Sequence, residues 1–91
     1  MEKTALKVIF SGRVQGVGFR YNVLSLAGGY RISGYVRNLR DGTVELFAQG
    51  DESETEAFIN AVCRRMDRYI QDQYRTIVPV EPAIKDFRIK Y

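Results

Sequence analysis

Residues 12–20 have the sequence Gly-Arg-Val-Gln-Gly-Val-Gly-Phe-Arg and lie between an apolar run at residues 6–10 and a helix-forming run at residues 21–27. This pattern predicts a strand, a short loop containing Gly16 and Gly18, and then a helix. Glycines allow successive backbone N–H groups to turn inward, so that a phosphate can approach closely. The start of the helix adds free N–H donors and the positive end of its dipole. The stretch therefore predicts an anion site between the strand and the helix.

Arg20 stands in or just before the first turn of that helix, where a cation gains nothing from the helix dipole. A planar guanidinium that binds two phosphate oxygens is one reason for an arginine at this position. The loop lacks the Gly-Lys-Ser/Thr of a P-loop and does not fit the G-x-G-x-x-G of a dinucleotide site. The spacing alone is equally consistent with a tight turn beside a solvated arginine.

Outward from the loop, hydrophobic periodicity and turn residues predict alternating strands and helices. The expected strands are residues 5–14, 33–38, 43–49, 74–80 and 87–91, and the expected helices are residues 19–28 and 54–70. The order β-α-β-β-α-β, with one more strand, is typical of an α+β, ferredoxin-like two-layer sandwich. We expect an antiparallel sheet, two helices on one face, and a short extra strand at the end of the chain.

The order of these elements brings two distant segments together. A crossover helix joins the strands at residues 5–14 and 33–38, so the two strands run in the same direction. Their carboxyl ends then lie at one edge of the sheet. The glycine loop leaves the first strand at that edge, and Asn38 ends the second strand there. We therefore expect a phosphate cradle beside a carboxamide, although Asn38 is also typical of a simple turn residue.

Composition limits the class of protein. With 91 residues and 45% apolar content, the sequence predicts one domain over residues 1–91 with one modest core. The sequence lacks histidine and Cys63 is its only cysteine, so neither a zinc site nor an internal disulfide is expected. No apolar run approaches the roughly 20 residues of a membrane helix, and residues 1–4 carry no signal-peptide pattern. These features favour a cytoplasmic protein without a membrane partner.

The net charge of +3 makes the chain mildly basic. This charge falls short of the dense basic stripe typical of nucleic-acid binding, so we expect no nucleic-acid partner. An anionic small-molecule substrate is compatible with the excess of arginine, and so is an ordinary solvated surface. A monomer is the default expectation for a chain of this size.

The sequence resembles the acylphosphatase family in two blocks. In order, these blocks are the loop motif at residues 12–20 and the run Gly34-Tyr-Val-Arg-Asn38, Asp41-Gly42-Thr-Val44, Gln49-Gly50. The ending Phe87-x-Ile89-x-Tyr91 is also similar to the usual family ending. The resemblance is strong over residues 6–50 and weaker over residues 87–91.

Residues 51–86 depart from the family pattern. The family usually has a Gly-Pro near the end of its second helix, and residues 64–73 contain neither glycine nor proline. We therefore expect the second helix of this chain to run longer than is usual in the family. This departure lies outside the two blocks that carry the resemblance.

The resemblance implies an enzyme that hydrolyses acyl phosphates, the mixed anhydrides of a carboxylic acid and phosphate, without a metal or cofactor. It assigns phosphate binding to Arg20 and orientation of the attacking water to Asn38. The phosphoryl oxygens are then expected to accept hydrogen bonds from the backbone amides of Gln15, Gly16, Val17, Gly18 and Phe19. Inorganic phosphate or sulfate would bind at the same place as a product-like ligand.

The alternative is a catalytically weak, ferredoxin-like module that binds an anion or RNA, because this fold carries many functions. The RNA-binding version needs exposed aromatic residues in an RNP pattern. Phe10 and Phe47 lie on expected strands, but that pattern is absent. Gln15 and Arg13 are expected only to shape the loop, and Asp41 only the hairpin turn.

Overall fold

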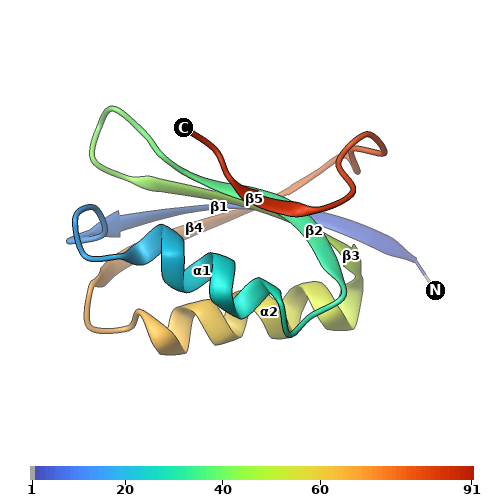
Figure 1. The fold of residues 1–91 in the computed structure, drawn as a ribbon, viewed down its shortest axis with the longest axis horizontal. Helices are drawn as coiled ribbons and strands as arrows, with labels where there is room; N and C mark the ends of the chain where they lie inside the picture. Colours follow the sequence, from blue (N-terminus) through green and yellow to red (C-terminus); the bar gives the residue numbers. More distant parts are fainter. Residues whose placement is uncertain (1) are drawn as a thin grey trace.

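The computed structural model describes residues 2–91, which form two layers. In chain order the elements are β1 (Lys3–Gly12), α1 (Phe19–Ala27), β2 (Ile32–Asn38), β3 (Val44–Asp51), α2 (Glu52–Arg65), β4 (Ile70–Val78) and β5 (Phe87–Ile89). The strands form one sheet in the order β4-β1-β3-β2-β5. Figure 1 shows both helices on the same face of this sheet, which confirms the expected ferredoxin-like sandwich.

The sheet is antiparallel except at one edge. β1 pairs antiparallel with β3 and β4, and β2 pairs antiparallel with β3. β5 is the expected extra strand, but it pairs parallel with β2 and makes the sheet mixed. The reason is the path of the loop before β5, where Asp86 O accepts a hydrogen bond from Gly34 N–H of β2 at 2.8 Å. The chain thus arrives beside the start of β2 and then runs along it.

The hydrophobic core lies between the sheet and the two helices. Leu6, Val8 and Phe10 of β1 are buried and alternate with the partly exposed Lys7 and Ile9, as their spacing predicts. Burial of each such side chain contributes about 1.5–3 kcal/mol. The rings of Phe10 and Phe19 pack with their centroids 5.2 Å apart. This contact joins the end of β1 to the start of α1, and it therefore fixes both ends of the glycine loop.

The second helix is shorter than expected. It ends at Arg65, and residues 66–69 form turns that lead directly into β4. Tyr69 N–H and Ile70 N–H both donate to Met66 O, which closes these turns without a glycine or proline. The expectation of a helix over residues 54–70 was therefore wrong at its end. Pairing of Ile70 with the end of β1 outweighs the helical periodicity of the preceding residues.

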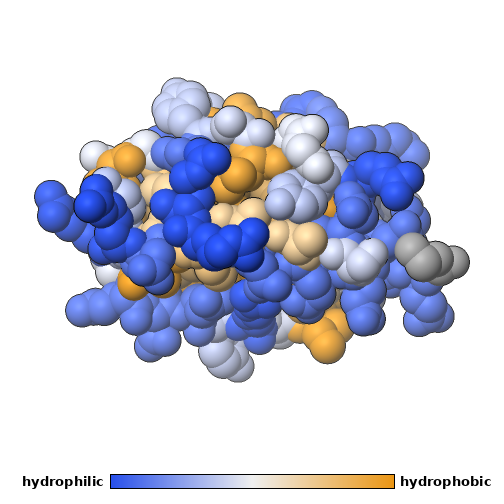
Figure 2. All heavy atoms as spheres, turned by 90° about the horizontal axis from the view of Figure 1, so that it is seen from below, coloured by the Kyte–Doolittle hydropathy of each residue, from blue (hydrophilic) through white to orange (hydrophobic). Residues whose placement is uncertain are grey.

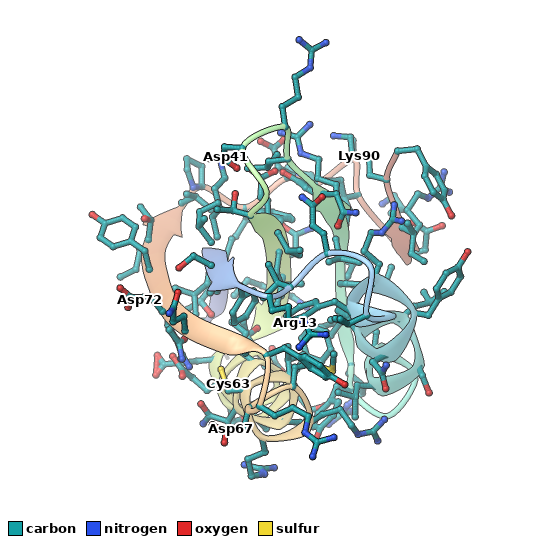
Figure 3. All side chains as sticks on the ribbon, turned by 90° about the vertical axis from the view of Figure 1, so that its left-hand side faces the viewer. Arg13, Asp41, Cys63, Asp67, Asp72 and Lys90 are labelled. Atoms are coloured by element: carbon teal, nitrogen blue, oxygen red, sulfur yellow. The ribbon has the colours of Figure 1, made fainter. Side chains whose placement is uncertain are left out.

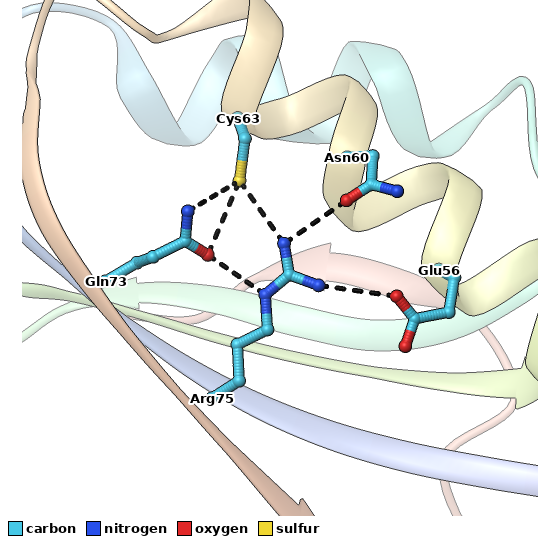
Figure 4. A network of polar contacts seen from close by, with 5 residues as sticks. All are labelled: Glu56, Asn60, Cys63, Gln73 and Arg75. Atoms are coloured by element: carbon cyan, nitrogen blue, oxygen red, sulfur yellow. Dashed lines mark hydrogen bonds and ion pairs between the residues drawn. The ribbon is translucent and has the colours of Figure 1, made fainter.

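A polar network joins α2 to the exposed edge strand β4 (Figure 4). Arg75 of β4 donates to Glu56 at 3.3 Å and to Asn60 at 3.2 Å, both on α2. Cys63 is half-buried and contacts Arg75 and Gln73 through its Sγ. Exposed ion pairs of this kind contribute roughly 0–1 kcal/mol, so the network fixes the side chains of β4 more than it stabilises the fold.

Figure 2 views the helix side of the molecule, where most of the surface is hydrophilic and surrounds a smaller apolar area. The large exposed apolar side chains of α1 are Tyr21 and Leu24. Within residues 2–91, neither helix is long and apolar enough to cross a membrane.

Candidate active site

The loop between β1 and α1 presents unpaired backbone donors. Gly16 and Gly18 both have a φ of 78°, in the left-handed region that glycine adopts without a Cβ clash. Gly18 is also the N-cap of α1. Within residues 2–91, the backbone N–H groups of residues 15–19 donate no hydrogen bond to another protein group. These donors and the positive end of α1 are therefore available to an anion.

Arg20 is the second residue of α1, directly after the loop. In the described part of the chain its guanidinium makes no ion pair with a carboxylate. The guanidinium carbon lies 5.1 Å from the centroid of the Tyr91 ring. The neighbouring Tyr21 hydroxyl raises the pKa of Tyr91 above its ordinary value, while the charge of Arg20 opposes this shift. Arg20 is thus held from one side by an aromatic ring, and its charge is not neutralised.

Asn38 lies at the end of β2, in the same row of the sheet as the end of β1. Both Asn38 and Phe10 pair with Val44 of the intervening strand β3. Along β2, Asn38 has the same side-chain parity as buried Val36, which faces the helix layer. The Asn38 Oδ1 atom is buried and has no hydrogen-bond partner among the described residues. Leaving such an acceptor unsatisfied costs about 1–3 kcal/mol, which a bound donor can recover.

These groups line one small cavity of about 210 Å³. Its lining residues are Val14, Gly16, Gly18, Phe19, Arg20, Tyr21 and Asn38. The volume is below the roughly 300–1,000 Å³ of pockets that enclose drug-sized ligands, so the cavity suits a small ion. Figure 3 views this end of the molecule, with Arg13 at the start of the loop and Asp41 on the β2–β3 turn above it. The structure thus brings together the glycines, the arginine and the asparagine that the sequence singled out.

Gln15 and Val17 are not among the residues that line the cavity. The Gln15 side chain extends instead to the β2–β3 turn, where Nε2 donates to Leu39 O at 2.8 Å and to Thr43 O at 2.9 Å. From the sequence, this side chain is expected only to shape its own loop. Nothing in the sequence marked the contact, because its acceptors are main-chain carbonyls that any residue supplies.

Two neighbouring charged residues stay outside the cavity. Arg37 has the opposite parity to Asn38, and on the open face of the sheet it donates to Glu45 at 2.8 Å. This hydrogen bond raises the pKa of Arg37. Asp41 accepts hydrogen bonds from Thr43 Oγ1 and Thr43 N–H, which lower the pKa of the Asp41 carboxyl. Asp41 is therefore a hairpin residue, as expected from the sequence.

The fold and the cavity define a small α+β sandwich with a small cavity at one end of its sheet, lined by the glycine loop, Arg20 and Asn38. The sequence model of the acylphosphatase family matches residues 6–89. A Clostridium acetobutylicum protein named acylphosphatase is 43% identical, and the match covers 100% of this chain and 99% of that protein. An acylphosphatase from Geobacillus thermodenitrificans is 42% identical over 92% of this chain and 90% of its own length.

Solved structures agree with these sequence matches. The crystal structure of acylphosphatase from Bacillus subtilis superposes on this chain with a TM-score of 0.85. The two sequences are 33% identical, and the match covers 97% of this chain and 99% of that chain. The chain belongs to the acylphosphatase family.

Proposed function

We propose that this chain, a hydrolase acting on acyl phosphates, holds the phosphoryl group in the cavity between the glycine loop, Arg20 and Asn38. The products are a carboxylate and inorganic phosphate. The observation that carries the proposal is that loop residues with unpaired main-chain donors, Arg20 with no ion pair, and Asn38 with an unpaired Oδ1 all line one small cavity, as judged within residues 2–91. Among the described residues these groups have no hydrogen-bonding or ion-pair partner, and a phosphoryl group or a water molecule can take that place.

Phosphate binding is proposed for the loop and Arg20. The backbone N–H groups of Gln15, Gly16, Val17, Gly18 and Phe19 point donors at the phosphoryl oxygens, as in other anion sites built from turns at a helix start. Arg20 adds a planar pair of charge-assisted hydrogen bonds. Charge spreads over the phosphoryl oxygens in the transition state, so fixed donors around them lower the barrier.

Orientation of the attacking water is proposed for Asn38. Its buried Oδ1 accepts a hydrogen bond from a water molecule and so holds the water beside the phosphoryl group. A carboxamide is too weak a base to take the proton, which leaves to a phosphoryl oxygen or to solvent. Placing water and substrate together in the correct geometry supplies much of the rate enhancement in such a reaction.

We propose that the reaction needs neither a metal nor a cofactor. An acyl phosphate is already an activated anhydride, and the carboxylate is a good leaving group. Positioning and charge stabilisation by the loop, Arg20 and Asn38 are therefore sufficient. We also propose that residues 1–91 act as one catalytic domain and as a monomer. We propose the cytoplasm as its location, because a chain with a single cysteine forms no internal disulfide and so suits a reducing compartment.

RNA binding through the open face of the sheet is the weaker alternative. Phe10 is fully buried in the core, and Phe47 is only 3% exposed. Tyr35 stacks on Phe47, and Lys90 Nζ lies 4.4 Å from the centroid of the Tyr35 ring. Stacking of a base needs an open aromatic face, and these rings are covered.

The test is hydrolysis of acetyl phosphate and benzoyl phosphate by the purified chain, with and without EDTA. We expect turnover of both substrates, competitive inhibition by inorganic phosphate, and the same rate in EDTA. Absence of turnover would exclude a catalytic role for the cavity. Loss of turnover in EDTA that returns with a divalent metal would exclude only the metal-independent mechanism.

A further inference from the structure

The Gln15 side chain is the direct link between the glycine loop and the turn that follows Asn38. Its Nε2 atom carries two hydrogens, and each has an acceptor, Leu39 O at 2.8 Å and Thr43 O at 2.9 Å. Both hydrogen bonds are partly buried. Water therefore competes with them less than at an exposed site, and the carboxamide is held in one orientation.

The two acceptors are the residues that close the β2–β3 turn. Leu39 N–H donates to Thr43 O at 2.9 Å, and Gly42 N–H donates to Leu39 O at 3.2 Å. Leu39 directly follows Asn38 in the chain. A displacement of this turn relative to the loop therefore moves the Asn38 backbone relative to the phosphate donors.

We propose that Gln15 is a positioning residue, whose side chain holds Asn38 at a fixed distance from the phosphate cradle. The proposal rests on the function proposed above. The backbone N–H of Gln15 belongs to the cradle, while its side chain reaches the turn beside the water-orienting asparagine. One residue thus spans the gap between the two halves of the site. Misplacing reacting groups by about 1 Å costs up to 10²-fold in rate, so loss of the link lowers turnover.

The test is a double-mutant cycle between Gln15 and Asn38. Gln15→Met keeps the length of the side chain and removes both N–H donors without adding a charge. We expect it to lower kcat by about 10- to 100-fold and to change the inhibition constant of inorganic phosphate by less than about 3-fold. In the Asn38→Ala background, Gln15→Met should lower kcat by less than about 3-fold, because residues that act through one another are not additive.

Gln49→Met is the matched control. Gln49 is also a glutamine with little exposure, and its Nε2 donates to Ser33 Oγ, Glu81 O and Ile84 O at the opposite end of the sheet. Its loss should lower the melting temperature at least as much as Gln15→Met does, while kcat stays within about 2-fold. A purely structural role for Gln15 would give the same pattern as Gln49.

Besides that pattern, two further outcomes overturn the proposal. One is an equal loss of kcat from Gln15→Met in the wild-type and Asn38→Ala backgrounds. The other is a rise in the phosphate inhibition constant as large as the fall in kcat, which would place the role of Gln15 in the cradle itself. If circular dichroism shows that Gln15→Met does not fold, Gln15→Asn replaces it in the same cycle. Gln15→Asn keeps the amide on a side chain that is one methylene shorter. If Asn38→Ala alone leaves kcat unchanged, the proposed function fails instead.

Discussion

The carboxamides of Gln49 and Asn38, at opposite ends of the sheet, differ in their hydrogen bonding. Gln49, near the end of β3, is 5% exposed and fully engaged. Its Nε2 donates to three acceptors and its Oε1 accepts from Glu81 N–H at 2.7 Å, which fastens the loop between β4 and β5. Asn38, at the end of β2, has a buried Oδ1 without any partner among the described residues.

Under the proposed function, Gln49 is an amide that stabilises the fold, whereas Asn38 is an amide that binds a water molecule. Gln49 contributes hydrogen bonds to the folded state, whereas the orphaned oxygen of Asn38 costs stability until a donor binds. The unpaired N–H groups of residues 15–19 and the unneutralised Arg20 lie at the same end as Asn38. Under the proposed function, that end of the molecule gives up stability for binding, as functional sites commonly do.

Arg20→Ala should give the largest loss of turnover among substitutions at this end of the sheet. Removal of a charge-assisted contact to a developing anion costs about 10²–10³-fold or more in turnover. Phosphate inhibition should weaken as well, because Arg20 contacts the ground state and the transition state alike. The measurement is kcat with acetyl phosphate together with the phosphate inhibition constant. Arg64→Ala, at an exposed position of α2, is the control and should leave both values unchanged. An Arg20→Ala enzyme with normal turnover would refute the assignment.

Asn38→Ala should have the second largest effect. It should lower turnover without weakening phosphate binding. We expect kcat to fall by about 10²-fold, since the attacking water loses its orientation, while the phosphate inhibition constant stays nearly constant. The melting temperature should not fall as it does for a satisfied amide such as Gln49, because the substitution removes an orphaned acceptor. Equal losses of phosphate affinity and turnover would mean that Asn38 binds the phosphoryl group.

Tyr91→Ala should have a smaller effect, through Arg20. A cation–π contact at an exposed site is weak, so its loss should change affinity by only about 2- to 5-fold. The phosphate inhibition constant should rise by that factor, because the guanidinium loses the ring that restrains it. Tyr91→Phe keeps the ring and should behave as wild type. A similar loss in Tyr91→Phe would assign the effect to the hydroxyl and its contact with Tyr21.

The smallest expected effect is that of Asp41→Asn on the melting temperature. Hydrogen bonds from Thr43 lower the pKa of the Asp41 carboxyl. A lowered pKa means that the ionised carboxylate stabilises the folded state above the unfolded-state pKa of about 3.9. This stabilisation is lost as the pH falls through the folded-state pKa. The difference in melting temperature between wild type and Asp41→Asn should therefore be largest near neutral pH and shrink below pH 4. A constant difference would contradict the shift, and kcat at neutral pH should not change.

At the end of the sheet that carries the candidate site, much of the arrangement could be predicted from the sequence. The motif at residues 12–20 and the β-α-β order place the loop and Asn38 at one edge, and side-chain parity separates Asn38 from Arg37. These inferences use local patterns and one topological rule. The two contacts of Gln15 could not be inferred, because their acceptors are main-chain oxygens 24 and 28 residues away.

The α2–β4 junction was less predictable. Met66 and Tyr69 continue the apolar spacing of the helix, and no glycine or proline marks its end. The helix nevertheless stops at Arg65, since Ile70 pairs with Gly12 at the start of β4. Tertiary pairing overrides local propensity at such a boundary. The parallel pairing of β5 also depends on a long-range contact, between Gly34 and Asp86.

The central claim is that the main-chain amides of residues 15–19 hold the phosphoryl group. Titration of the ¹⁵N-labelled chain with inorganic phosphate, followed by amide NMR shifts, tests it most directly. We predict that the largest saturable shifts fall on the N–H groups of residues 15–19, and that Arg20→Ala weakens them. Saturable shifts centred elsewhere, with residues 15–19 unchanged, would contradict the account.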